Sequence, residues 1–330
     1  MKYLPRWLGD HATMILIWLG LIGLFSLGSD RFFTPATFAS LGAQIPTLTV
    51  VAAGMTFVII TGGIDLSVGS VLGFAGAVFG VALVNFHLAV ALAELLALVA
   101  GGLSGWLNGW ISVRFRLPSF IVTLGMLEVA RGLSYLCTDS QTKYLGGILG
   151  GLSRPLPGVG LSAALLLAMV VVAALQLVLS HTVFGRRIVA IGTNTEAVRL
   201  AGIDPDGPKV AVFALTGLLV GLGAIFYIAR LGSSDPNAGV GLELSAIAAV
   251  VIGGTSLSGG RGSVVSTFLG VLIIATLETG LAQLGASEPL KRVVTGTVIV
   301  TAAIVDGWRT GGPGGQGRFW RKFLRRPPAA

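Results

Sequence analysis

Long apolar runs follow one another along almost the whole chain, and they constrain the fold more than any other feature. A transmembrane helix needs about 20 consecutive apolar residues to cross the hydrocarbon of a bilayer. Runs near this length are separated by charges, prolines or glycine clusters. They cover residues 12–28, 41–61, 66–86, 88–112, 117–137, 160–180, 209–229, 243–259, 263–284 and 290–307. The pattern predicts an all-α bundle of about ten spans, with residues 1–330 forming a single transmembrane domain.

The composition points to lipid as the solvent of this bundle. Hydrophobic residues make up 54% of the chain and charged residues 11%, whereas a soluble domain carries about 25% charged residues. The net charge of +8 is expected from basic cytoplasmic loops, so nucleic acid is not an expected partner. One cysteine, Cys137, and three dispersed histidines provide neither an internal disulfide nor a zinc site, and no metal or cofactor is expected.

The distribution of Lys and Arg predicts the orientation. The first apolar run follows Lys2 and Arg6 and lacks a clear A-x-A cleavage site, which favours an uncleaved span over a signal peptide. With ten spans and both termini inside, 15 of the 22 Lys and Arg residues fall on the inner side and seven on the outer side. This excess agrees with the positive-inside rule. The termini, a loop at about 181–208 and a basic tail at about 308–330 are therefore predicted to be cytoplasmic, the tail near anionic lipid.

A polar interruption separates the second and third apolar runs. Its notable residues are Gly62, Gly63, Asp65, Ser67, Gly69 and Ser70. Two adjacent glycines break a helix, and an Asp or Ser can cap the next helix at its N-terminus. Irregular backbone at membrane depth can also line a polar pathway. The residues alone leave both interpretations open, a helix cap or a broken helix beside a path.

Other small and charged residues allow more than one interpretation. Glu128, Arg131 and Glu243 are intramembrane polar candidates, because charges inside spans usually face a partner or a cavity. Glu128 and Arg131 are three residues apart, which favours a local ion pair. A second set is predicted to allow close helix packing: Gly101, Gly102, Gly105 and Gly109. The segment 253–258 resembles 62–67, either through duplication of transporter halves or by chance recurrence of glycine-rich turns.

The longest inner loop contains a short capped helix. Asn194 is suited to an N-cap, Glu196 to the first turn and Gly202 to the C-terminal stop. Ala197, Leu200 and Ala201 share one face of this helix. A two-turn helix is marginal alone, so it is expected to dock on its own membrane domain or on a cytoplasmic partner.

Several segments together resemble one family. The run Gly54–Ser70 resembles the signature of the permease subunits of ribose/xylose/galactose-type (monosaccharide) ABC importers. The inner loop resembles that family's coupling segment through Gly192, Asn194, Glu196, Ala197, Arg199, Leu200 and Gly202. Further matches are 120–126 with 130–132, and 242–244 with 246–260. The resemblance covers about Phe33 to Asp306, whereas Asp139–Gly160 and the tail differ from the family pattern.

The resemblance implies a transport subunit without catalysis of its own in a bacterial inner membrane. The chain lacks a G-x-x-x-x-G-K-[ST] phosphate loop, so ATP hydrolysis is expected in separate cytoplasmic ABC ATPase subunits that push the short helix. A periplasmic sugar-binding protein would deliver a monosaccharide, and a second permease subunit, identical or paralogous, would enclose the path. The segment Gly62–Ser70 would lie near that path. The alternatives are an ion-coupled secondary transporter, which needs an intramembrane ion site, and a membrane enzyme, which needs clustered catalytic residues.

Overall fold

The computed structural model describes residues 6–156 and 160–310, which form a mostly helical bundle. The elements in chain order are α1 (Arg6–Gly28), α2 (Pro35–Ile60), α3 (Val68–Val84), α4 (Val90–Arg114), α5 (Ser119–Thr138), β1 (Lys143–Tyr144), α6 (Gly150–Ser153), α7 (Ala163–His181), α8 (Val183–Thr193), α9 (Thr195–Leu200), α10 (Asp206–Leu231), β2 (Ser233–Ser234), α11 (Leu242–Ile252), α12 (Val264–Gln283) and α13 (Glu288–Thr310). Residues 311–330, most of the predicted basic tail, lie outside the described residues.

Each of the ten predicted apolar runs contains a helix, but the helices differ in length. Within the described ranges, seven are long and apolar enough to cross a membrane: α1, α2, α4, α5, α7, α10 and α12. The apolar helices α3 and α11 are shorter, with 17 and 11 residues. The predicted span 243–259 is therefore wrong as a full crossing, because α11 ends at Ile252 and extends only about 16 Å. The chain is a multi-pass helical membrane protein, and ten full crossings are not confirmed.

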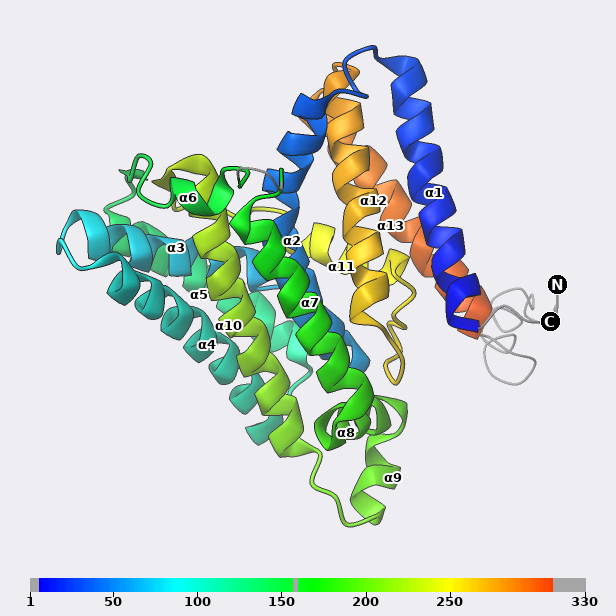
Figure 1. Ribbon diagram of the computed structural model, residues 1–330. Coiled ribbons are helices and arrows are strands. Elements are labelled where there is room, and N and C mark those ends of the chain that lie inside the picture. The colour runs from blue at the N-terminus through cyan, green and yellow to red at the C-terminus, as the bar shows by residue number, and fades with distance from the viewer. Residues whose placement is uncertain (1–5, 157–159, 311–330) are drawn as a thin grey trace, which may run out of the picture.

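Helix α2 forms the centre of the bundle. Figure 1 shows α1, α12 and α13 on one side of α2, and α3, α4, α5 and α10 on the other. The apolar segment of α2 is 89% buried, although Pro46 lies within it. The main core joins its buried residues to those of α3, α7, α10, α11 and α12. A smaller cluster around Phe25, Phe32 and Leu277 attaches α1 to α12.

Glycines allow α4 and α10 to pack closely, as the sequence predicts. A Cβ on Gly101 would collide with the Gly217 carbonyl of α10, and one on Gly105 with the Phe213 carbonyl. Gly109 lies against Val210 of the same helix. These glycines bring the two backbones together where larger side chains would hold them apart. This close packing on α10 positions α4 beside the interrupted segment between α2 and α3.

A small polar layer covers one end of the bundle. Strands β1 and β2 pair antiparallel, with Lys143 opposite Ser234. The Ser234 hydroxyl donates a 2.7 Å hydrogen bond to the Gly76 carbonyl of α3. At the other end, Figure 1 shows α8 and α9 beside the beginning of α10. The two ends therefore carry different irregular segments.

Candidate functional site

The glycines after α2 end this helix as predicted. Thr61 is its C-cap, and Gly62 adopts a φ of +80°, a left-handed conformation that glycine accommodates without a Cβ clash. Gly62 N–H donates to the Ile59 carbonyl at 2.9 Å, and Gly63 N–H donates to the Val58 carbonyl at 3.0 Å. This is the Schellman pattern of helix termination. The chain then runs without helix from Gly63 to Ser67 before α3 begins at Val68.

Hydroxyl groups of α5 satisfy the backbone of the interruption. Ile64 N–H donates to Ser119 Oγ at 3.0 Å, and Leu66 N–H donates to Thr123 Oγ1 at 3.1 Å. Thr123 Oγ1 also lies 3.3 Å from the Ile64 carbonyl oxygen, to which it can donate. Non-helical backbone inside a membrane needs such partners because water is scarce there. Helix α5 is therefore part of the structure that makes the interruption possible.

Asp65 is buried within a chain of polar side chains. Its Oδ1 accepts hydrogen bonds from Ser67 N–H at 2.9 Å and from Ser67 Oγ at 2.6 Å. Asn108 of α4 donates from Nδ2 to Ser67 Oγ at 2.9 Å. Ser67 occupies the N-cap position of α3 but forms no side-chain cap bond. Of the two residues that could cap α3, Ser67 therefore forms no side-chain cap, and Asp65 holds the segment just before the helix.

Gly69 and Ser70 lie in the buried first turn of α3. A Cβ on Gly69 would collide with the Gly239 carbonyl and the Glu243 carboxylate. This glycine lets the connection between α10 and α11 lie directly on α3. The interruption and the first turn of α3 thus contact three helices, α4, α5 and α11, and this connection.

The predicted ion pair between Glu128 and Arg131 is wrong. Arg131 Nη1 instead donates to the carbonyls of Pro236 and Ala238, at 2.6 and 2.9 Å. The guanidinium supplies charged donors to two carbonyls of the connection between α10 and α11. Glu243 lies on the first turn of α11, and its carboxylate lies against Gly69 of α3. Arg131 therefore holds this connection against α5, and Gly69 leaves room for Glu243 beside α3.

A cavity of about 190 Å³ lies beside the interruption. Its lining combines backbone of Gly62 and Gly63 with Ser112, Ser119 and Lys209. Lys209 belongs to the first turns of α10. The non-helical backbone therefore borders a polar space, as irregular backbone at membrane depth requires.

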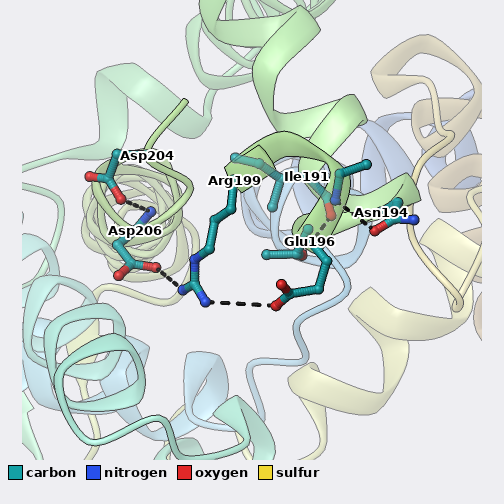
Figure 2. Close-up of polar contacts among 8 residues, drawn as sticks. Ile191, Asn194, Glu196, Arg199, Asp204 and Asp206 are labelled. Carbon is teal, nitrogen blue, oxygen red and sulfur yellow. Dashed lines mark hydrogen bonds and ion pairs between the residues drawn. The ribbon is translucent and has the colours of Figure 1, made fainter. Parts of the chain in front are cut away.

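The inner loop folds into α8 and α9, and its predicted caps are confirmed. Figure 2 shows Asn194 beside Ile191 and Glu196, at the junction of the two helices. Asn194 Oδ1 accepts from Ala197 N–H at 3.0 Å, which caps α9. Gly202 has a φ of +77° and donates its N–H to the Arg199 carbonyl at 2.9 Å. Helix α9 therefore begins and ends where the sequence predicts.

Charged groups connect α9 to the beginning of α10. Arg199 lies 3.7 Å from the Glu196 carboxylate and 3.3 Å from that of Asp206 (Figure 2). Asp204 accepts a hydrogen bond from Asp206 N–H at 3.0 Å. The ion pairs are exposed, so each adds at most about 1 kcal/mol to stability. These ion pairs orient the solvent-exposed side of α9 relative to the beginning of α10.

One face of α9 is not covered by the other residues that the structure describes. Ala197, Leu200 and Ala201 are exposed, and Leu200 is 89% exposed. Val198 is buried and attaches the opposite side. Helix α9 thus docks on its own domain through Val198 and presents an apolar face outward.

The end of α8 contacts the end of α2 directly. A Cβ on Gly192 would collide with the Ile60 carbonyl oxygen and with the N–H of Gly260. Gly260 N–H also donates to the Ile60 carbonyl at 2.9 Å. We call Ile60, Gly192 and Gly260 the glycine junction. It connects the inner loop with the interruption only two residues before Gly62.

The similar segment at 253–258 has a related geometry with a different register. Gly254 has a φ of +80°, and its N–H donates to the Val251 carbonyl at 2.9 Å. Thr255 N–H donates to the Val250 carbonyl at 3.2 Å. These bonds match those after α2 when Gly62 is aligned with Gly254, one residue from the alignment that sequence similarity suggests. A duplication of the two halves stays a prediction.

Sequence reasoning missed the residues that hold these segments in place. Ser119, Thr123 and Asn108 support the first interruption. Gln176 of α7 accepts from the N–H groups of Val264 and Val265 at 2.8 and 3.3 Å, which satisfies the beginning of α12. A lone Ser, Thr, Asn or Gln in an apolar run carries no pattern that identifies its tertiary partner.

Comparisons with known proteins agree on one family. Residues 37–303 match the family model described as branched-chain amino acid transport system / permease component. The chain is 39% identical over 311 residues to a ribose import permease of Escherichia coli, covering 92% of this chain and 95% of the relative. It is 40% identical over 315 residues to the Bacillus subtilis ribose import permease, covering 93% of each. A Rhizobium meliloti fructose import permease is 31% identical over 305 residues, covering 90% and 85%.

Proposed function

Because the chain belongs to the family of branched-chain amino acid transport system / permease components, we propose that it is the membrane subunit of an ABC importer for a monosaccharide. Relatives named as ribose and fructose import permeases align over most of their length and support a sugar cargo. Because these relatives are named as permeases, we propose no catalytic activity for this chain. An ion-coupled mechanism has no support among these relatives.

The orientation of the importer follows from the charges and the fold. We place both termini and α8–α9 in the cytoplasm of a bacterium and the β1–β2 layer on the periplasmic side of its inner membrane. The count of basic residues supports this choice. In Figure 1, α8, α9 and the beginnings of α10 and α12 lie toward the same end of the bundle.

The single observation that carries the coupling role is the uncovered apolar face of α9. Leu200 is exposed although the helix is capped and attached by Val198. Leu200 forms a continuous exposed apolar face with Ala197 and Ala201, and such a face on a helix that we place in the cytoplasm fits a protein interface. We assign this face to a separate ABC ATPase subunit, which would push α9 and α8 during ATP binding.

Two further partners complete the proposed assembly. A periplasmic sugar-binding protein would deliver cargo to the side formed by β1, β2 and the connection between α10 and α11. A second permease subunit, either identical or paralogous, would close the path. The segment from Gly62 to Ser70 would lie near this path, supported by its non-helical backbone and the polar cavity beside it.

Reconstitution of this chain with an ABC ATPase subunit and a sugar-binding protein tests the function. Vesicles are given ATP and labelled ribose, fructose, arabinose or leucine, and uptake is measured. ATP-dependent uptake of a sugar is expected. Uptake of leucine alone, or uptake that follows an ion gradient without ATP, would contradict the proposal.

A pair of double variants tests the coupling role of α9. Glu196→Ala with Arg199→Ala removes the ion pairs of α9, and Glu288→Ala with Lys291→Ala removes a similar exposed pair of 3.2 Å on α13. Both cost little stability because the pairs are exposed. The α9 variant is expected to uncouple ATP hydrolysis from uptake, whereas the α13 variant transports normally. Equal coupled transport by both variants would remove α9 from the mechanism.

A further inference from the structure

Helix α5 exposes a carboxylate halfway along its length. Glu128 lies nine residues from the beginning of α5 and ten from its end, about 14 Å from either end. Its side chain is exposed, and among the described residues it forms no hydrogen bond or ion pair. Gly125 and Gly132 flank it on the same side, and no atom lies within 4 Å of where their Cβ atoms would be. This part of α5 is therefore open and polar.

The exposed surface of the neighbouring helix α4 is different. It consists of large apolar residues, namely Leu92, Leu95, Val99, Leu103, Trp106 and Trp110. An apolar stripe of this kind is suited to contact with lipid tails. An ionisable side chain in the middle of a span instead faces the bundle interior or a water-filled cavity. The Glu128 carboxylate is thus unsuited to lipid, whereas Ile121 and Leu124 on the same side of α5 are exposed apolar residues.

Polar groups continue from Glu128 toward the C-terminal end of α5. Arg131 is half-buried one turn further on, where it binds carbonyls of the connection between α10 and α11. Tyr135 follows after another turn, and its hydroxyl donates to Asn237 Oδ1 at 2.5 Å. Asn237 is exposed. Carboxylate, amide and phenol groups therefore occur in succession between the middle of the helix and the proposed periplasmic end.

We propose that the Gly125–Glu128–Gly132 face of α5 lines the water-filled translocation path, and that Glu128 accepts hydrogen bonds from hydroxyl groups of the sugar in transit. The inference rests on the proposed importer function. A neutral polyhydroxylated cargo provides donors for the unpaired carboxylate, and the glycines leave room beside it. Exposed apolar residues of α5, namely Ile121, Leu124, Val129 and Leu136, lie around Glu128. The proposed polar lining is therefore confined to Glu128, the two glycines beside it, and Arg131 and Tyr135 further along the helix.

Cysteine labelling of the assembled transporter tests the location of Glu128. In a Cys137→Ser background, Glu128→Cys is compared with Leu103→Cys on the apolar stripe of α4. A charged, membrane-impermeant thiol reagent is expected to modify Glu128→Cys at least tenfold faster than Leu103→Cys. Saturating sugar-loaded binding protein with ATP is expected to slow this modification.

Three labelling results would overturn the inference. In the first, only an apolar maleimide reacts, equally at both positions, which would place Glu128 in lipid. In the second, Glu128→Cys resists the aqueous reagent and instead cross-links two permease subunits, which would place this face in their interface. In the third, the cargo leaves the aqueous modification rate unchanged, which would refute contact with the sugar.

Uptake by Glu128→Gln tests the hydrogen-bond role without a change of shape. About a tenfold lower initial rate is expected from the loss of a charged acceptor, with unchanged ATPase association and unchanged thermal stability in detergent. Wild-type uptake would refute the role. These results are separate from the importer proposal, because the wild-type transporter establishes the cargo and the aqueous labelling of position 128 needs no cargo.

Discussion

Replacing Thr123 by Val removes one of the α5 hydroxyls that support the interruption between α2 and α3. The change keeps the branched shape of the side chain but removes Oγ1, which accepts from Leu66 N–H at 3.1 Å. Thr123 is fully buried and Leu66 is half-buried, so water replaces the lost acceptor poorly. An orphaned buried N–H costs about 1–3 kcal/mol. A loss near 2 kcal/mol lowers the ratio of folded to unfolded protein roughly thirtyfold.

Thr138→Val on the same helix is a matched control. Thr138 is also fully buried, but its Oγ1 donates to the carbonyl of Ser134 within α5 at 2.8 Å. This carbonyl already accepts the helical N–H, and a hydroxyl bonded back to its own helix adds little or nothing to stability. We expect a change below about 0.5 kcal/mol, the size seen where no special interaction is lost.

Unfolding of both variants in mixed micelles by a denaturing detergent measures the difference, with tryptophan fluorescence as the signal. Thr123→Val is expected to unfold at a lower detergent fraction and to import sugar more slowly, because the interruption loses a support. Ser119→Ala, which orphans the N–H of Ile64, is expected to behave similarly. Equal stability of Thr123→Val and Thr138→Val would refute the claim that α5 hydroxyls hold the interrupted backbone.

Substitutions and their controls test three further contacts. Gly192→Ala adds a Cβ that collides with the α2 carbonyl at the glycine junction. This variant is expected to abolish uptake while the ATPase still co-purifies with the permease. As a control, Gly207→Ala should transport normally, because its Cβ meets no atom closer than 3.8 Å. Asp65→Ala is expected to lower uptake about tenfold and Asp65→Asn to restore part of it, since the amide keeps one acceptor; unchanged uptake and folded yield with alanine would exclude a role. Gln176→Leu orphans the N–H of Val264 and is expected to destabilise the protein by about 1–3 kcal/mol in the same unfolding assay; wild-type stability would contradict the capping role.

Features that depend on residues nearby in the sequence could be predicted from local sequence patterns. The apolar runs locate the helices, because lipid requires about 20 apolar residues per crossing. Gly62 and Gly202 mark helix ends with positive φ, and Asn194 caps α9. Each of these outcomes is decided within one turn of the chain. They could therefore be predicted from residue type and spacing.

Features decided by packing between helices could not be predicted in this way. Arg131 is close in sequence to Glu128 but binds the Pro236 carbonyl, 105 residues away. A serine or threonine in a membrane helix usually bonds to its own helix, as Thr138 does. Thr123 differs only because the interrupted backbone lies beside it. Residue type alone cannot distinguish these two threonines.

The glycine junction gives the coupling proposal a physical requirement. The Ile60 carbonyl accepts Gly260 N–H at 2.9 Å, and the position of a Gly192 Cβ would overlap both partners. A displacement of α8 toward α2 therefore must move the Ile60 carbonyl or break its bond to Gly260, since no free space remains between them. Either change acts two residues before Gly62, where the helix already ends. If the ATPase moves α9 and α8 as one unit, the motion reaches the end of α2 and the Gly260 loop directly at the glycine junction, beside the interruption.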